Sequence, residues 1–259
     1  MDFKTTFKLF SPTLSGVLQS DKTKEWIVKG FIDAYRNIYP MTNDTEVVSK
    51  LIEIILLPYL DNFAKTNGYI LELPDCQNHY PDVTIASKQD KFAIDIKTTY
   101  RIKNSLVNGM TLGSFTGYFR QRSDKKNILY PYSSYNEHYV LGIIYSRSNE
   151  IYSNETVFRL KDLKNIKTPI SDFEIFFQEK YRIASDKPGS GNTKNIGSEN
   201  KIKDLTTGNG IFVREFGDAA KEMFDKYWMN YETKDMAKSM DRSIPQYNNL
   251  EKFKKFFNL

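Results

Sequence analysis

The sequence predicts a mixed α/β (α+β) fold in a single domain. Three observations predict it: a length of 259 residues with 40% hydrophobic side chains, one clear amphipathic helical segment, and several short strand-like runs between polar stretches. A chain of this length and composition can bury a full core, and single α/β domains often reach this size. We therefore expect one domain over residues 1–259.

The clearest predicted helix runs from Thr45 to Leu60. Apolar residues recur in it at helical spacing, and the preceding Asn43 and Asp44 offer side chains that can cap its start. Strand-like runs follow at residues 69–73, 82–86, 92–99, 139–145 and 174–177. Residues 185–201, rich in Gly, Ser and Asn, are predicted as a long loop, either functional or a disordered surface segment. The tail from residue 215 contains two more helical stretches.

Composition limits the class of protein. The 37 Lys and Arg residues exceed the 32 Asp and Glu residues, a formal charge of +5 that leans mildly toward polyanionic partners. Cys76 is the one cysteine, so an internal disulfide and a cysteine-based zinc site are both excluded. The longest apolar run is short and is interrupted by Glu53 and Pro58, and no secretory signal is visible. We expect a soluble cytoplasmic protein with no membrane partner.

One strand-like run, FAIDIKTTY, carries two charges at its centre. Successive side chains of a strand point to opposite faces, so Ile94 and Ile96 share the apolar face while Asp95 and Lys97 share the other. Asp82 begins the preceding strand-like run, and a short hairpin through residues 87–91 would bring it beside Asp95. Two carboxylates and one ammonium would then converge on one point.

Such a constellation suits phosphodiester hydrolysis. Clustered carboxylate oxygens bind a hard cation such as Mg²⁺, which takes phosphate oxygens as further ligands, and a lysine adds positive charge at the phosphate. The bare pattern is weak, because it arises by chance in unrelated chains. Taken alone, it favours a solvated Asp–Lys pair on an exposed strand. Glu53 has two interpretations as well: a metal-site carboxylate, or a surface partner of Lys50 three positions earlier. The two histidines are too far apart in the chain to indicate a histidine-based site.

Motifs spread along the chain point to a known family. They are QNHYPD (77–82), AIDIKTTY (93–100), KNILYP (126–131), GSGNTKNIGS (189–198), GNGIF (208–212) and YWMNYE (227–232). In this order they resemble the EcoRV family of type II restriction endonucleases, within the PD-(D/E)xK nuclease superfamily. The resemblance spans residues 39–231 and implies a restriction-endonuclease-like core, in which helices flank a mixed central β-sheet.

The resemblance also implies roles for individual residues. It implies that Asp82 and Asp95 are metal ligands, that Lys97 is the catalytic lysine, and that Glu53 is an auxiliary acidic residue that assists catalysis and metal binding. Residues of two loops and of the strand are implied to contact DNA: Gln77, Asn78, Thr98, Thr99, Lys126, Gly189, Ser190, Gly191, Asn192, Thr193 and Asn195. The cofactor implied is Mg²⁺, with Mn²⁺ as a substitute.

The resemblance finally implies an activity and an assembly. The expected enzyme is a homodimer that cuts both strands of a palindromic double-stranded DNA site, GATATC, bluntly and leaves 5′-phosphates. A catalytic and DNA-binding lobe is expected at about residues 44–145 and 174–232, and a dimerisation region at about residues 25–43 and 146–170. Two alternatives stay open: a structure-specific or repair nuclease of the same superfamily, and an inactive DNA-binding relative.

Overall fold

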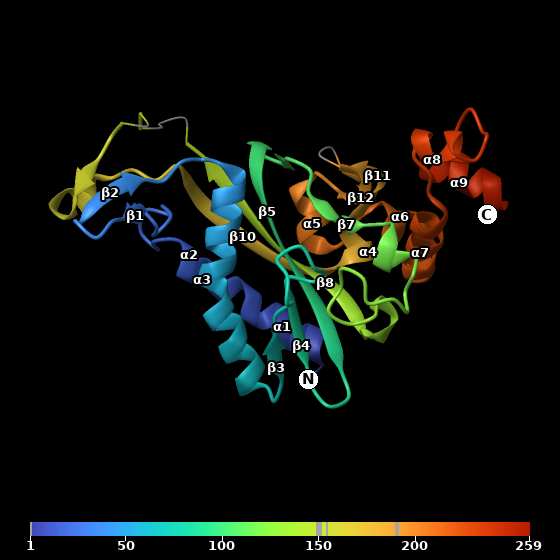
Figure 1. The fold of residues 1–259 in the computed structure, drawn as a ribbon, viewed down its shortest axis with the longest axis horizontal. Helices are drawn as coiled ribbons and strands as arrows, with labels where there is room; N and C mark the ends of the chain where they lie inside the picture. The colour runs from blue at the N-terminus through green and yellow to red at the C-terminus, as the bar shows by residue number, and fades with distance from the viewer. Residues whose placement is uncertain (1, 149–151, 154, 190–191) are drawn as a thin grey trace.

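A computed structural model describes residues 2–148, 152–153, 155–189 and 192–259, and for Asn192 and Thr193 the backbone alone. The fold is α+β, with a mixed central sheet flanked by helices (Figure 1). The sheet has six strands in the described residues, in the order β10 (Ile170–Glu179), β8 (Glu137–Arg147), β5 (Lys91–Lys103), β4 (Val83–Ala86) and β3 (Ile70–Glu72), with β6 (Leu106–Val107) paired to β5. Strands β5 and β8 run parallel, and the other pairs are antiparallel. The predicted fold class is confirmed.

Helix α3 (Thr45–Thr66) covers one face of this sheet. Asp44 caps it by accepting hydrogen bonds from the backbone N–H groups of Glu46 and Val47. Its buried stripe packs into a core cluster that contains the strand residues Ile94 and Ile96, together with α1 (Phe3–Phe10) and α2 (Ser15–Leu18). The helix is longer than predicted, because it continues past Leu60 to Thr66 and buries Phe63 and Ala64. Burial of the apolar stripe on both sides of Pro58 offsets the hydrogen bond that this proline cannot donate.

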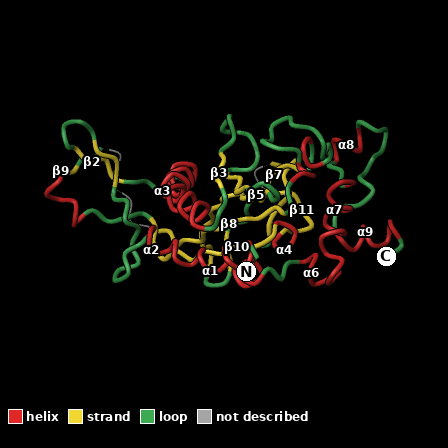
Figure 2. The backbone as a smooth tube through the Cα atoms, turned by 90° about the horizontal axis from the view of Figure 1, so that it is seen from below, coloured by secondary structure: helices red, strands yellow, loops and turns green. Residues whose placement is uncertain are grey.

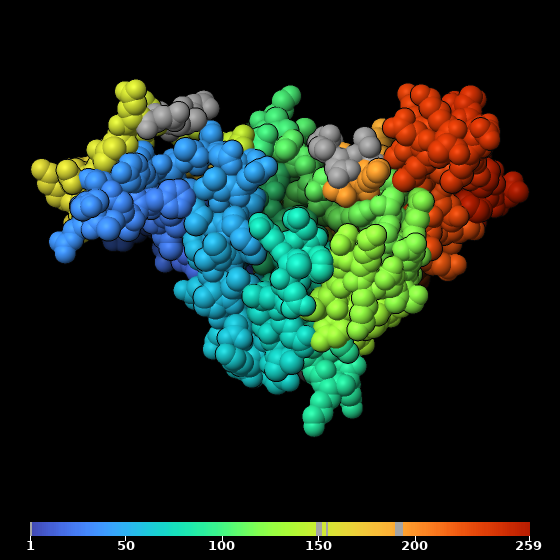
Figure 3. Space-filling view, in the orientation of Figure 1, coloured from blue at the N-terminus to red at the C-terminus, as the bar shows by residue number. Residues whose placement is uncertain are grey.

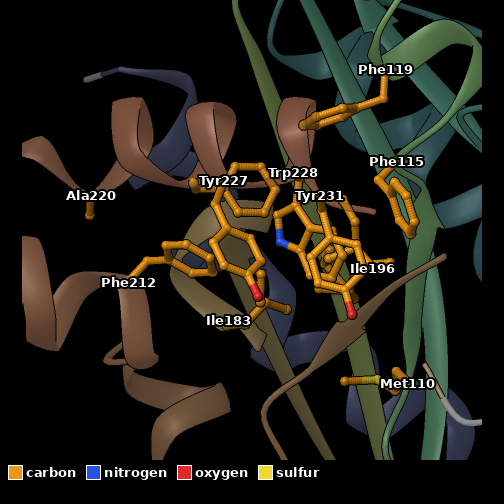
Figure 4. Packing of buried hydrophobic residues seen from close by; sticks show 14 of the residues in the cluster. Met110, Phe115, Phe119, Ile183, Ile196, Phe212, Ala220, Tyr227, Trp228 and Tyr231 are labelled. Atoms are coloured by element: carbon orange, nitrogen blue, oxygen red, sulfur yellow. The ribbon is translucent and has the colours of Figure 1, made fainter. Parts of the chain in front are cut away.

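A second core cluster lies against the opposite face of the sheet. It is built from β7 (Thr111–Ser114), α4 (Lys180–Ile183), α5 (Ile202–Thr207), α6 (Ile211–Phe216) and α7 (Ala220–Asn230). Large aromatic side chains fill it, and Figure 4 shows Phe115, Tyr227, Trp228 and Tyr231 gathered at its centre. The strand β5 is therefore covered on both faces.

The predicted loop at residues 185–201 is mostly a β-ribbon, so that prediction was wrong. Strand β11 (Ala184–Gly189) pairs antiparallel with β12 (Asn192–Ser198), and β12 pairs in turn with β7. The composition of the segment is typical of turns, but pairing with the distant strand β7 satisfies its backbone groups. Ser190 and Gly191 lie outside the described residues.

Two arms extend from opposite ends of the molecule (Figures 1 and 2). One is a three-stranded antiparallel sheet of β1 (Gly30–Ile32), β2 (Asn37–Pro40) and β9 (Phe158–Arg159). The other consists of α8 (Lys234–Lys238) and α9 (Leu250–Phe257). Short 3₁₀ helices complete the described elements: η1 (Ser11–Leu14), η2 (Gly117–Phe119), η3 (Tyr132–Ser134), η4 (Leu160–Asn165) and η5 (Gly217–Ala219).

The other predicted elements are confirmed with shifted ends. Each strand-like run coincides with a strand of the central sheet, and β5, β8 and β10 extend beyond the predicted runs. Both helical stretches of the tail form, as α7 and α9. Among the described helices, none combines the length and apolar character that a bilayer crossing requires.

Candidate active site

The hairpin of β4 and β5 brings the two predicted aspartates together. Val83 lies opposite Ile94 in the antiparallel register, so Asp82 falls beside the residues that follow Ile94 on β5. The backbone N–H of Ile96 donates a hydrogen bond of 2.7 Å to Oδ2 of Asp82. The hairpin predicted from the sequence is confirmed, and it fixes the first carboxylate on the backbone of the second strand.

Lys97 completes the cluster. Its Nζ lies 2.8 Å from Oδ1 of Asp95 and 3.6 Å from Oδ2 of Asp82. Asp95 is only 3% exposed, because β5 is buried on both faces. A solvated ion pair on an exposed strand, the simple alternative from the sequence, is therefore excluded.

The electrostatics of the cluster follow from its burial. Burial raises the pKa of the Asp82 carboxyl to about 6; the Lys97 ammonium opposes this shift, and the nearby Asp95 carboxylate adds to it. Burial alone would lower the pKa of Lys97, but the two carboxylates outweigh it and raise that pKa above its ordinary value. The lysine is thus held in its charged form beside the two carboxylates.

One carboxylate oxygen in the cluster has no partner among the residues that the structure describes. Oδ2 of Asp95 is buried without a hydrogen bond, although buried polar atoms in proteins are almost always paired. The described residues hold no group of three or more acidic, histidine or cysteine side chains arranged around one metal position. Two carboxylates nevertheless fit Mg²⁺, which commonly takes one or two protein oxygens and keeps waters or phosphate oxygens as its other ligands.

The cluster borders a hollow of about 450 Å³. Asp82 and Lys97 line it, together with Ser49 of α3 and with Met110 and Thr111 at the start of β7. A second hollow, of about 390 Å³, lies between α3 and the loop after β3, and Asp82 and Glu53 line both hollows. The two therefore form one groove past the aspartates, and Figure 3 shows the surface recessed between α3 and the lobe that carries β7.

Glu53 lies in this groove but apart from the other carboxylates. Its Oε1 accepts a hydrogen bond of 2.7 Å from Nζ of Lys50, the surface partner that the sequence offered. It does not join Asp82 and Asp95 in a three-carboxylate cluster within the described part of the chain. Its role as an auxiliary acidic residue stays a prediction.

The predicted DNA-contacting residues occupy different parts of the groove. Gln77 and Asn78 are exposed and line the second hollow, and Thr98 lines the first, with its hydroxyl hydrogen-bonded to Ser49. Thr99 also borders the first hollow, but it is buried and its hydroxyl donates to the carbonyl of Asn108. Its hydroxyl hydrogen is therefore already engaged within the protein.

Lys126 lies outside both hollows, on an exposed loop. The next residue, Asn127, accepts a backbone hydrogen bond of 3.0 Å from Tyr80 through its carbonyl. The loop that carries Lys126 is therefore hydrogen-bonded to the segment that precedes Asp82.

The β11–β12 ribbon reaches the same groove from the other side. A Cβ on Gly189 would come within 2.5 Å of Cγ2 of Thr111, which lines the first hollow. This close approach requires a residue without a side chain. Asn195 pairs with Ser114 across β12 and β7, so the ribbon is fixed to the wall of the groove. The predicted contacts of Ser190 and Gly191, and of the Asn192 and Thr193 side chains, fall outside what the structure describes.

Comparison with known proteins now decides the family. The family model described as restriction endonuclease EcoRV matches residues 22–258. The chain belongs to the EcoRV restriction endonuclease family. The match is longer than the span from 39 to 231 over which the sequence motifs showed a resemblance, since it also includes β1 and the start of β2 in the first arm and both helices of the second.

A curated relative agrees with this assignment. The chain is 38% identical over 234 residues to the type II restriction enzyme EcoRV of Escherichia coli, an alignment that covers 88% of this chain and 92% of the relative. Among solved structures, the NlaIV restriction endonuclease matches with a TM-score of 0.35 and 10% identity, over 83% of this chain and 82% of the other. As a member of the EcoRV family, the chain is a hydrolase that acts on DNA as a site-specific endonuclease.

Sequence patterns missed the residues behind the EcoRV-family cluster. Tyr80, Tyr118 and Lys180 are packed beneath it, and the tyrosine rings of Tyr80 and Tyr118 stack at 5.0 Å. Tyr80 could have been recognised as part of the site from the sequence, because it directly precedes Pro81 and the predicted metal ligand Asp82. Lys180 sits in the charged run QEKYR and gave no such signal, because charged runs usually lie on solvated surfaces.

Proposed function

We propose that this chain is a Mg²⁺-dependent type II restriction endonuclease that, as a homodimer, cuts both strands of GATATC at its centre, leaving blunt 5′-phosphate ends. The observation that carries the proposal is the convergence of Asp82, Asp95 and Lys97 at a groove whose other wall carries the β11–β12 ribbon. Mn²⁺ is expected to replace Mg²⁺. A ribbon that recognises the base sequence favours a restriction enzyme over a structure-specific nuclease, because a structure-specific nuclease needs no segment that contacts base edges.

In this proposal the residues of the cluster have distinct tasks. Asp82 and Asp95 would hold the Mg²⁺ ion, which when bound neutralises phosphate charge and activates water. The backbone N–H of Ile96 fixes the Asp82 carboxylate, and the Lys97 ammonium holds Oδ1 of Asp95 while leaving the other oxygen unpaired. Lys97 also places a permanent positive charge at the groove, where it stabilises the negative charge that develops on the attacked phosphate.

The GSGNT ribbon would read bases in the major groove. Backbone groups and short amide or hydroxyl side chains such as Asn192 and Thr193 can pair with base edges there. The loop with Gln77 and Asn78 lies at the other end of the groove and would follow the minor groove. The ribbon sequence supports GATATC, because GSGNT is the motif on which the resemblance to the EcoRV family depends in this segment.

The dimer is proposed from the arm of β1, β2 and β9. This arm, within the predicted dimerisation region, exposes apolar side chains that include Phe31 and Tyr39, which pair across the strands β1 and β2. Exposed apolar patches on soluble proteins commonly mark interfaces. A two-fold dimer would read both halves of a palindrome identically.

Digestion of a plasmid of known sequence tests the proposal. The purified protein is incubated with Mg²⁺, with Mn²⁺ or with EDTA, and the fragment ends are sequenced. We expect blunt 5′-phosphorylated ends at every GATATC with either metal and intact plasmid with EDTA. Staggered ends or a different site would overturn the proposed specificity, and cleavage directed by DNA structure would favour a repair nuclease. Binding without any cleavage would indicate an inactive relative.

A further inference from the structure

A buried lysine lies behind the catalytic carboxylates. Lys180, the first residue of α4, is only 2% exposed, and its Nζ donates a hydrogen bond of 2.9 Å to the hydroxyl of Tyr80. The same ammonium lies 4.1 Å from the centre of the Tyr80 ring. A lysine is almost never buried without a specific partner, because its charge loses hydration there. This contact therefore calls for a functional explanation.

The hydrogen bonds around Tyr80 run in one direction. Nε2 of His138 lies 3.1 Å from the carbonyl of Tyr132, which can only accept, so this nitrogen carries the proton. Burial keeps His138 neutral by lowering its pKa well below the ordinary value, so Nδ1 is an acceptor. The Tyr80 hydroxyl, 3.0 Å from Nδ1, must then donate to it. Lys180 supplies the hydrogen bond that the same hydroxyl oxygen accepts.

This chain of bonds is anchored at both ends. The rings of His138 and Tyr132 stack with centroids 3.6 Å apart, and His138 lies on the central strand β8. Lys180 follows the end of β10, the neighbour of β8 in the sheet. The Tyr80 hydroxyl is therefore fixed from two adjacent strands of the sheet.

The fixed Tyr80 side chain in turn holds the nearby residue Asp82 of the cluster in position. Its backbone is bonded on both sides of the residue, through its N–H to Asn127 and through its carbonyl to the N–H of Leu129. Two positions later Asp82 accepts the hydrogen bond from Ile96 that sets its distance from Asp95. Rotation or displacement of the Tyr80 ring would move the start of β4 and with it the Asp82 carboxylate.

We propose that Lys180 is a positioning residue of the catalytic centre: through the Tyr80 hydroxyl it holds the segment from Tyr80 to Asp82 in place, and so keeps the two metal-binding carboxylates correctly spaced. Lys180 itself touches neither carboxylate in this arrangement. The inference rests on the proposed function, since it assigns a support to the site that the proposal places at Asp82, Asp95 and Lys97.

Two variants distinguish a positioning role of Lys180 from a direct effect of its charge. Tyr80→Phe removes the bridging hydroxyl without changing the formal charge, whereas Lys180→Met removes both the bridge and a positive charge. Lys221→Met is the matched control. Lys221 and Lys180 line the same cavity of about 230 Å³, beside the start of β8, but Lys221 is half exposed and pairs with Glu137. Steady-state cleavage of a duplex with one GATATC site gives kcat and KM, and electron paramagnetic resonance of the DNA-free protein gives the affinity for Mn²⁺.

We expect Tyr80→Phe and Lys180→Met to lower kcat by about tenfold to a hundredfold, because small misplacements of catalytic groups have effects of this size. KM for the duplex should stay unchanged, since the walls of the groove are intact, and Tyr80→Phe should bind Mn²⁺ several-fold more weakly. Lys221→Met should match the wild type in all three measurements.

Several outcomes would overturn the inference. One is a wild-type kcat and Mn²⁺ affinity in Tyr80→Phe. Another is tighter Mn²⁺ binding by Lys180→Met with no change in Tyr80→Phe, which would show that Lys180 acts through its charge alone. If Lys180→Met does not fold, Tyr80→Phe decides. If the wild-type protein cleaves no DNA, the proposed function fails, and the Mn²⁺ affinities still test the positioning.

Discussion

Nζ of Lys97 lies 2.8 Å from Oδ1 of Asp95, two positions earlier on the same strand and face. Asp95 is buried, so this ammonium is its main electrostatic compensation in the protein alone. Removal of one member of a buried ion pair leaves the other charge without compensation, which costs more than the pair contributes. Lys97 therefore has a structural task in the metal-free protein as well as its proposed task at the phosphate.

Substitution of Lys97 should separate these two tasks. We expect Lys97→Met to lower cleavage at least about a hundredfold, because charge stabilisation at the phosphate is lost. Without metal it should also lower the free energy of unfolding by up to about 3 kcal/mol. Mn²⁺ should restore much of this stability but not the cleavage. Plasmid cleavage and urea unfolding, with and without Mn²⁺, measure both effects.

The control for this prediction is Lys65→Met on α3. Lys65 pairs with Asp61 on the exposed side of the helix, where such a pair contributes only tenths of a kcal/mol. It should leave cleavage and stability unchanged. Substantial cleavage by Lys97→Met would show that the catalytic lysine is elsewhere.

Asp82 gives a prediction about pH. Its pKa is raised by burial from 3.8 to about 6, so between these values the folded protein binds more protons than the unfolded chain. The contribution of this group to stability is therefore present below about pH 4 and is lost as the pH rises through 6. Asp82→Asn removes the buried charge, and in EDTA it should be more stable than the wild type above pH 6, on the order of 1 kcal/mol.

Urea unfolding across a pH series measures this difference. The advantage of Asp82→Asn should shrink as the pH falls from 7 to 4, whereas Asp61→Asn, on the exposed side of α3, should show no such trend. A difference that does not change with pH, or that grows toward acid, would contradict the raised pKa.

The local features of the site were predictable from the sequence. The alternation in FAIDIKTTY places Asp95 and Lys97 on one face, and the short spacing from Asp82 predicts the hairpin that joins them. The burial of Asp95 was not predictable, because the residues that cover it come from the second core cluster, far away in the chain. The β-ribbon and Lys180 were missed for the same reason: distant partners, β7 and Tyr80, determine their structure.

Glu53 should affect cation binding more than chemistry. It lines both hollows but pairs with Lys50, so its negative charge acts on a cation in the groove at a distance. An interaction of this kind contributes about 1 kcal/mol near a protein surface. We expect Glu53→Gln to lower the cleavage rate about fivefold at limiting Mg²⁺, because a loss of about 1 kcal/mol in the free energy of cation binding corresponds to a change of about this size. The loss should disappear when Mg²⁺ is saturating.

Rates measured over a series of Mg²⁺ concentrations test the role of Glu53. Asp61→Asn, which removes a carboxylate from the same helix outside the hollows, should leave the series unchanged. A loss in Glu53→Gln that persists at saturating Mg²⁺ would instead assign Glu53 a direct part in the chemistry.

The apolar surface of the first arm should hold two chains together. Phe31 of β1 is 49% exposed and lies opposite Tyr39 of β2, which is also exposed, so the two rings present one apolar face. Phe31→Glu would place a charge in that face. Leu9→Glu, an exposed apolar residue on α1 outside the arm, is the matched control. Sedimentation should find two chains of 30.2 kDa in the wild type and the control, and one in Phe31→Glu.

The same substitution should change the product of cleavage. A dimer places one catalytic cluster at each strand of the palindrome, whereas a single chain reaches one strand at a time. A supercoiled plasmid with one GATATC site should therefore be converted directly to linear DNA by the wild type and by Leu9→Glu. Phe31→Glu should accumulate nicked circles at a reduced rate, with its far-ultraviolet circular dichroism unchanged. A wild type that sediments as one chain, or a Phe31→Glu variant that stays dimeric and produces linear DNA, would show that the arm is not the dimer interface.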